Sequence, residues 1–213
     1  MKINLSFEAK QSSTELHIFS CFNKTAEAKT SKKATAKSTT KPEKTLSHAH
    51  WPEDLVEAFE HSVASKHYKA EVGEIFSLTL VSGASAIVLG LGDNNKFTKE
   101  ILRRQIAHAY KVISHKFIDA TLHIDGFLVK GHTEESITAI VESLYMTSYT
   151  FDRHLSHKKT IKLETIILAT TEKKTAAKKF EAAIAEGHTI GSCIKVARDF
   201  VNEAPNILNS VHY

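Results

Sequence analysis

Alternating apolar and polar residues predict two strands near the N-terminus. The first run is INLSFEA at 3–9 and the second is LHIFSCF at 16–22, and the polar residues 11–14 between them suit a turn. Two more β-rich runs, EIFSLTLV at 74–81 and AIVLGL at 86–91, are joined by the short segment SGAS. Strands this close in the chain are typical of a hairpin.

Two further strands are expected in the second half of the chain. Residues 120–124 form a short β-rich run. Residues 161–169 (IKLETIILA) begin with alternation and end in a continuous apolar run, which is typical of a strand buried on both faces.

Apolar residues at helical spacing predict three helices before residue 150. The first opens at Trp51, where a proline and two acidic residues suit the first turn. The second covers 98–113, with Thr98 as its N-cap, and the third is expected to begin at a cap on Thr133.

A fourth, longer helix is predicted over about 178–201. Its apolar residues and glycines fall close to one face, at Phe180, Ile184, Gly187, Gly191, Ile194 and Val201. Because strands and helices alternate, we expect an α/β protein, a three-layer sandwich with a mixed β-sheet. The predicted division is an N-terminal α/β domain at 1–177 and a linker helix with the start of a further connection at 178–213.

The net charge of +4 comes from one segment. Residues 24–45 are rich in Lys, Thr and Ala, hold no large apolar residue, and are predicted to be a flexible insertion. The alternative is an arm that contacts DNA phosphates. The candidate contacts are the seven lysines of this segment, Lys24, Lys29, Lys32, Lys33, Lys37, Lys41 and Lys44.

Composition narrows the class of protein further. No apolar run reaches the ~18–20 residues of a membrane span, and the N-terminus lacks the apolar core of a secretory signal, so neither is expected. Cys21 and Cys193 lie in no metal or redox spacing, which favours a reduced, cytoplasmic setting.

Candidate chemistry is sparse. Gly90 and Gly92 stand at a strand end before a helix, where backbone amides can cradle a phosphate, although glycines also simply make turns. The pairs His48/His50 and His154/His157 have no carboxylates at metal spacing and are interpreted as surface histidines, and Ser156 with Lys159 matches a serine–lysine spacing by chance. The neighbours Asp152/Arg153 and Arg198/Asp199 are interpreted as structural ion pairs or caps. No catalytic, metal-binding or cofactor-binding residue is therefore assigned.

Four segments resemble the leucyl (cytosol) aminopeptidase family. Residues 197–206 (ARDFVNEAPN) resemble the family's ARDLVNEPPN, which closes the helix between its two domains. The others are IVLGLG at 87–92, YTFDRH at 149–154 and AIAEG at 183–187. The resemblance covers about 74–213; Ala204, His154 and the lysine-rich insertion depart from the family pattern.

The resemblance implies a macro-domain-like fold that ends in the linker helix and lacks the catalytic domain. In the family, two divalent metals (Mn or Zn) and the catalytic residues belong to that following domain, which removes residues such as leucine from the N-termini of peptides. The implied partners are the catalytic domain, other subunits of a hexamer and, in some bacterial members, DNA. Two alternatives stay open: a macro-like module that binds ADP-ribose or another nucleotide through Gly90 to Asn94, and a nucleic-acid accessory domain that uses the lysines.

Overall fold

The protein's computed structural model describes residues 1–7, 14–23, 51–65, 67–158, 160–204 and 207. Within these residues the strands are β1 (Lys2–Ser6), β2 (Leu16–Asn23), β3 (Ile75–Thr79), β4 (Ser85–Asp93), β5 (Asp119–His123) and β6 (Thr165–Ala169). The α-helices are α1 (Glu53–Ala64), α2 (Lys99–Ile113), α3 (Thr133–Ser148) and α4 (Ala177–Asn202). None of these helices is both long enough and apolar enough to cross a bilayer.

The described strands form one mixed sheet in the order β1-β6-β5-β2-β4-β3. The predicted hairpin is confirmed, because β3 runs antiparallel to β4, whereas all other neighbours are parallel. The first two strands are consecutive in the chain but are separated in the sheet by β6 and β5. Residues 8–13, which hold most of the predicted turn, lie outside the described residues.

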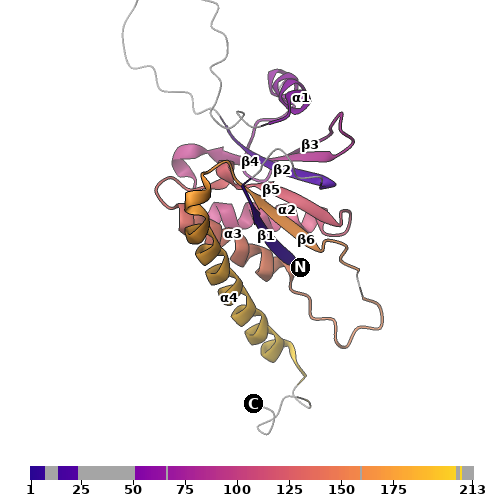
Figure 1. Cartoon of the computed structure of the whole chain (residues 1–213). Helices are drawn as coiled ribbons and strands as arrows, with labels where there is room; N and C mark the ends of the chain where they lie inside the picture. The colour runs from indigo at the N-terminus through magenta and orange to yellow at the C-terminus, as the bar shows by residue number, and fades with distance from the viewer. Residues whose placement is uncertain (8–13, 24–50, 66, 159, 205–206, 208–213) are drawn as a thin grey trace, which may run out of the picture.

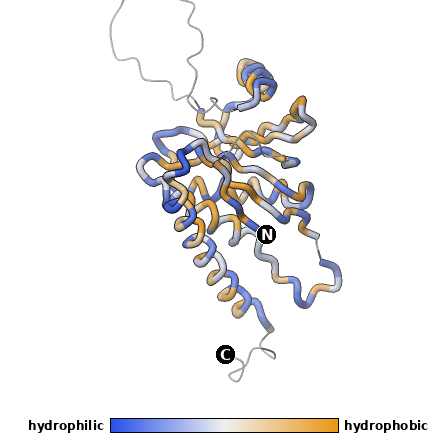
Figure 2. Tube along the Cα trace, in the orientation of Figure 1, coloured by the Kyte–Doolittle hydropathy of each residue, from blue (hydrophilic) through white to orange (hydrophobic). Residues whose placement is uncertain are grey.

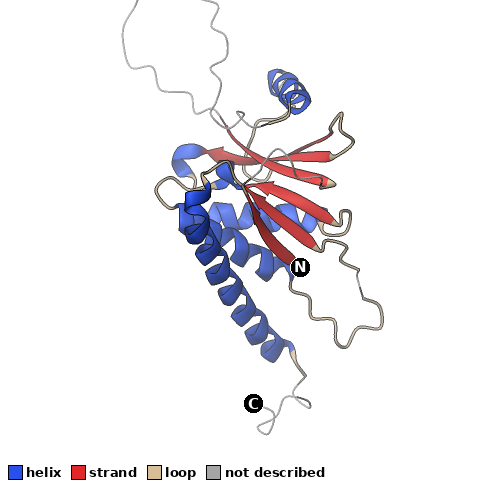
Figure 3. Cartoon of the chain, in the orientation of Figure 1, coloured by secondary structure: helices blue, strands red, loops and turns tan. Residues whose placement is uncertain are grey.

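Helices cover the two faces of the sheet unequally. Figures 1 and 3 show α2, α3 and α4 below the sheet and α1 above it. The three-layer sandwich predicted from the sequence is therefore confirmed. The larger apolar core lies between the sheet and the three helices α2, α3 and α4, and a smaller core surrounds Leu55 and Phe59 of α1.

The central strands β2 and β4 contribute to both cores. Leu16 and Ile18 of β2 lie in the larger core, whereas Phe19 and Cys21 lie in the smaller one. Successive side chains of a strand point to opposite faces, so a strand with both faces covered needs an almost continuous apolar run. In β4 seven consecutive residues are buried.

Residues 161–164 do not belong to the strand predicted over 161–169. The strand β6 begins at Thr165, while the backbone amides of Leu163 and Glu164 donate to the carbonyls of Ser114 and Ile118. The expectation that both faces are covered is also wrong. Ile166 and Leu168 are buried, but Thr165 and Ile167 are only half-buried, since α1 packs against β2, β3 and β4 rather than β6.

The N-termini of α2 and α3 can be compared with the two predicted N-caps, Thr98 and Thr133. Thr98 is the N-cap of α2, and its hydroxyl accepts a hydrogen bond from the amide of Ile101, as predicted. The predicted cap at Thr133 is wrong, because Thr133 is the first residue of α3 and His132 is the N-cap. There the hydroxyl of Ser136 donates to the carbonyl of His132 and accepts from the amide of Val129, so a residue one turn into the helix ties down its start.

The long helix α4 lies directly against α3 at two glycines. A Cβ atom at Gly187 would lie 2.7 Å from the carbonyl oxygen of Thr138, and one at Gly191 would lie 2.5 Å from Cβ of Tyr145. Real Cβ atoms do not come this close to other heavy atoms, so the spacing of the two helices requires glycine at both positions. Both glycines are buried, together with Phe180 and Ala183 on the same helix.

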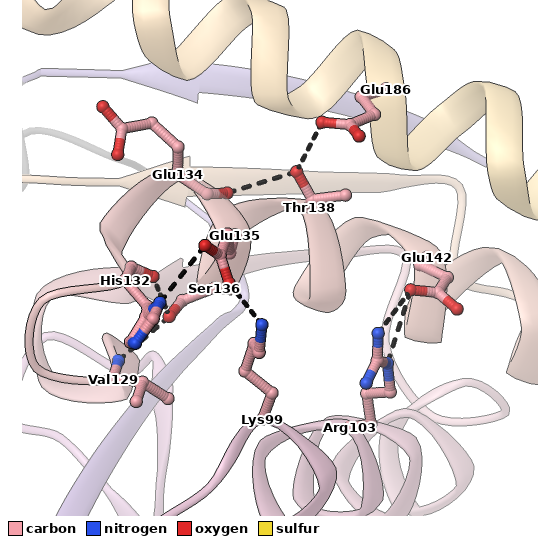
Figure 4. Close-up of polar contacts among 10 residues, drawn as sticks. All are labelled: Lys99, Arg103, Val129, His132, Glu134, Glu135, Ser136, Thr138, Glu142 and Glu186. Carbon is pink, nitrogen blue, oxygen red and sulfur yellow. Dashed lines mark hydrogen bonds and ion pairs between the residues drawn. The ribbon is translucent and has the colours of Figure 1, made fainter.

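Polar contacts hold the start of the three-helix layer together (Figure 4). Arg103 of α2 forms an ion pair with Glu142 of α3 at 3.0 Å, and Lys99 pairs with Glu135. The hydroxyl of Thr138 on α3 donates to the carbonyl of Ala183 at 3.2 Å. The same hydroxyl lies 3.3 Å from a carboxylate oxygen of Glu186 (Figure 4).

Beyond Gly191 the long helix leaves the domain. Its last turns extend past the sheet and include several apolar residues (Figures 1 and 2). The sequence pattern placed Val201 close to the same helix face as Phe180 and the two glycines, which are buried in the structure. In the structure its side chain is 84% exposed, because no described element packs beside this end of α4 at that position.

Substituting Gly191 with alanine is expected to destabilise the domain although alanine favours helix. The gain in helix propensity is about 1 kcal/mol. The overlap with Tyr145 is expected to cost more, about 1–3 kcal/mol, because the two helix backbones must separate. Urea unfolding of the wild type and Gly191→Ala measures the difference.

Thr189→Ala is the matched control, since Thr189 is exposed on the same stretch of α4. It should leave stability unchanged or raise it slightly. Equal or greater stability of Gly191→Ala would contradict the close packing of α3 and α4.

Candidate interdomain junction at the end of the long helix

The end of α4 is fastened to the segment that follows α3. We call this group of contacts the exit clamp. It consists of Tyr149, Arg153 and His154 after α3 and of Arg198, Asp199, Asn202 and Glu203 at the end of α4. These residues belong to two of the segments that carry the family resemblance, 149–154 and 197–206.

Glu203 is the centre of the clamp. It is the C-cap residue of α4, and its carboxylate accepts from Arg153 at 2.9 Å and contacts Nε2 of His154 at 2.7 Å. Arg153 also lies 3.5 Å from Asp199, one turn earlier in the helix. The side chain of Glu203 is only 8% exposed, whereas those of Arg153 and His154 are 58% and 50% exposed.

A second set of contacts joins Arg198 to the end of α3. The guanidinium lies over the ring of Tyr149, 4.1 Å from its centroid, and donates to the carbonyl of Met146 at 2.9 Å. This carbonyl belongs to the last turn of α3, where backbone oxygens lack helical partners and a cation is favourable. Asn202 donates to the hydroxyl of the same tyrosine at 3.1 Å.

The clamp changes the ionisation of Glu203. The hydrogen bond from His154 lowers the pKa of this carboxyl below its ordinary value, and the amide of Ala204 and the guanidinium of Arg153 act in the same direction. Burial opposes the shift but does not cancel it. Glu203 is therefore charged throughout the neutral range.

Sequence neighbours in the clamp do not pair as the sequence suggested. Arg153 pairs with α4, whereas Asp152 lies 3.6 Å from Lys158. Asp199 pairs with Arg153, whereas Arg198 contacts Tyr149 and Met146. Arg153, Arg198 and Asp199 are therefore paired across the junction, whereas Asp152 is paired within the loop that follows α3. In the sequence, the family resemblance of 149–154 and 197–206 marked both segments but did not indicate that they meet.

Exposed apolar residues surround the clamp. We call them the junction surface: Met146, Leu155, Val196, Phe200 and Val201, with exposed fractions from 37% to 84%. Val196 and Phe200 are four residues apart on α4 and so lie on one side of the helix. All five residues belong to the last half of α4, the last turn of α3 or the loop that follows α3.

A cavity of about 720 Å³ opens beside the clamp. Its lining residues come from α2, α3, α4, the start of the sheet and the segment before β6, and they are Met1, Lys2, Tyr110, Tyr145, Ser148, Tyr149, Thr150, Ile161, Leu163, Glu164, Thr165, His188, Ser192 and Lys195. Tyr149 belongs to both the cavity and the clamp. The cavity and the exit clamp are therefore adjacent.

The glycines proposed to hold a phosphate are engaged in the fold. The amide of Gly90 donates to the carbonyl of Glu74, and the amide of Gly92 donates to the carbonyl of Ala70. A Cβ at Gly90 would lie 2.2 Å from the carbonyl oxygen of Glu71, so this glycine lets the preceding chain cross the strand closely. Asp93 caps the next turn by accepting from the amide of Asn95. These two amides are not available to a nucleotide.

Other sequence candidates have the following outcomes. The seven lysines and the His48/His50 pair lie outside the described residues, so DNA binding through the lysines stays a prediction. His154 belongs to the clamp, and Ser156 and His157 are exposed in a loop. In the part of the chain that the structure describes, no group of three or more His, Cys, Asp or Glu residues is arranged to hold a metal ion.

The geometry defines an α/β domain that ends in a long, clamped helix. The model of the cytosol aminopeptidase family, N-terminal domain, matches residues 37–158. This chain belongs to that family, and the resemblance seen in its sequence is confirmed. The resemblance was expected to start at about residue 74. The family model instead matches from residue 37, which lies within the predicted insertion at 24–45.

Curated relatives in the family are much longer than this chain. A probable cytosol aminopeptidase of Bdellovibrio bacteriovorus is 32% identical over 141 residues, which are 65% of this chain and 27% of the relative. One from Clostridium perfringens is 31% identical over 146 residues, 66% of this chain and 29% of the relative. The chain thus spans less than a third of either protein.

Solved structures share the fold. A lysine-to-glutamate mutant of tomato leucine aminopeptidase matches 99% of this chain and 40% of its own, with a TM-score of 0.74 and 15% identity. The bottromycin maturation enzyme BotP matches 94% of this chain and 35% of its own, with a TM-score of 0.63 and 18% identity. In both, the likeness shows the α/β fold with its long helix.

The ionisation of Glu203 gives a test of the clamp. Because its pKa is lowered in the folded protein, its contribution to stability is complete above the unfolded value of about 4.3. It is lost as the pH falls through the lower folded value. An NMR titration of the Glu203 carboxyl carbon should show a midpoint below that of an ordinary glutamate.

His154→Gln and Arg153→Gln should each raise this midpoint toward the ordinary value. Lys158→Gln is the matched control, since Lys158 pairs with Asp152 and not with Glu203. A midpoint that does not move in either clamp variant would show that the contacts do not form in solution.

Proposed function

We propose that this chain is the non-catalytic N-terminal domain of a cytoplasmic dimetal leucyl aminopeptidase. The observation that carries the proposal is the exit clamp, which fixes the direction of α4 where its apolar residues leave the domain. A helix that ends on a solvated surface needs no such fixing. A helix that leads to a second domain does, because its angle sets where that domain lies.

The junction surface and the neighbouring cavity are proposed to contact the catalytic domain. Two observations support this assignment. Val201 and Leu155 are 84% and 56% exposed, although valine and leucine gain about 1.5–3 kcal/mol when buried. The curated relatives also continue well beyond the part that this chain matches.

Chemistry is proposed to lie in the following domain. There, two divalent metal ions, Mn or Zn, would polarise the scissile carbonyl and activate a water molecule, which releases an N-terminal residue such as leucine. The names of the relatives support an aminopeptidase, and one matched solved structure is that of BotP in complex with Mn. This chain's residues would position that domain and support assembly of a hexamer.

The first experiment is to read the coding sequence beyond the codon for Tyr213 and to express what it encodes. The longer protein is expected to release leucine from a leucyl peptide when supplied with Mn²⁺. The 213-residue chain should release none under the same conditions. A stop codon directly after Tyr213 would overturn the assignment to a larger aminopeptidase, as would activity of the isolated chain.

Val201→Ser tests the junction surface in the longer protein. Loss of one buried valine contact, worth about 1.5 kcal/mol, should open the junction about tenfold more often. Limited proteolysis at the junction should be faster by the same factor. Val81→Ser is the matched control, because Val81 is 91% exposed on the remote β3–β4 hairpin, and it should leave the cleavage rate unchanged.

A further inference from the structure

Two histidines from neighbouring strands face each other on the sheet surface that α1 covers only in part. His17 belongs to β2 and His123 ends β5, and the two strands run in parallel with His17 opposite Thr121. Nδ1 of His17 lies 3.2 Å from Nε2 of His123. Neither histidine belongs to the exit clamp, and the pair has no part in the proposed function.

Aromatic contacts hold the rings in place. The ring of His123 is stacked on Phe19, with centroids 4.2 Å apart and planes 9° from parallel. Phe19 in turn contacts Trp51 at 5.4 Å and is buried in the smaller core. One ring of the pair is thus seated on a packed aromatic surface, so its nitrogen keeps a fixed position.

The spacing of the two nitrogens fits a shared metal ion. Imidazole nitrogens bind zinc at about 2.0–2.1 Å, so two of them on one tetrahedral ion lie about 3.3–3.4 Å apart, and about 2.9 Å apart at a right angle. The observed 3.2 Å lies between these values. We propose that His17 and His123 bind a divalent transition-metal ion, Cu²⁺ more tightly than Ni²⁺ or Zn²⁺.

The surrounding charge suits a cation. Asp119 lies on the same strand face as His123, four residues earlier in β5, and its carboxylate acts electrostatically on His17. Both imidazoles are half-buried, and imidazole binds a metal ion in its neutral form. With two protein ligands, water would fill the other positions, which makes the site open and the ion exchangeable.

The sequence supplies a local probe for this site. Trp51 is the only tryptophan in the chain, and it is separated from His123 by a single ring. Titration of the 213-residue chain with Cu²⁺ should therefore quench tryptophan fluorescence with saturation. Zn²⁺, which does not quench, should compete and restore the signal.

His17→Gln and His123→Gln should each weaken this quenching at least tenfold. His188→Gln is the control, because His188 is an exposed histidine on α4, beside Tyr145, and it should leave the titration unchanged. A double variant, His48→Gln with His50→Gln, tests the histidines next to Trp51 in the chain. Loss of quenching in that double variant, with normal quenching in His17→Gln, would overturn the proposal.

A measurement on the wild-type protein covers the case in which a histidine variant fails to fold. In ¹⁵N spectra of the histidine side chains, Zn²⁺ should shift Nδ1 of His17 and Nε2 of His123 together, and leave the ring nitrogens of His188 in place. Unchanged signals of the pair at millimolar Zn²⁺ would show that the two rings form only a hydrogen bond, and the metal proposal would fall.

Discussion

Close approach of α3 and α4 is the constraint on which the rest of this domain depends. The long helix crosses the three-helix layer at Gly187 and Gly191, where side chains larger than hydrogen would meet Thr138 and Tyr145. Backbone contact at this distance fixes both the position and the direction of the helix. The positions of the charged and apolar residues at the C-terminal end of α4 depend on this contact between α3 and α4.

The exit clamp fixes the same helix a second time. Its ion pairs and cation–π contact are individually weak when exposed, with typical contributions up to about 1 kcal/mol. Their importance lies in geometry: Arg153 reaches two acidic residues one turn apart on α4, and Arg198 reaches back to the end of α3. Because α4 is held both at its middle and at its end, the direction in which it leaves the sheet is fixed. A fixed direction suits an N-terminal domain that precedes another domain.

The two faces of the sheet explain where polar groups can gather. Three helices cover one face, and the strands there contribute mostly apolar side chains to a large core, with Ser20 of β2 as a buried polar residue. The other face is covered by α1 over β2, β3 and β4, and on that side Asp119 and His123 of β5 and Thr165 and Ile167 of β6 are half-buried. His17 and His123 lie at the edge of the area that α1 covers. Both are half-buried there, and the ring of His123 is stacked on Phe19.

The sequence by itself determined the α/β class, the β3–β4 hairpin, the cap at Thr98 and the family, because these depend on local spacing, hydrogen bonds between near neighbours and recognisable segments. It also marked 149–154 and 197–206 as significant. Tertiary structure alone decided that Arg153 pairs with Glu203 rather than with Asp152, that β6 starts at Thr165, and that Gly90 serves chain crossing. Each of these depends on which residues, distant in sequence, the sheet order and the α3–α4 contact bring together, and the periodicity of one segment carries no information about the segment packed against it.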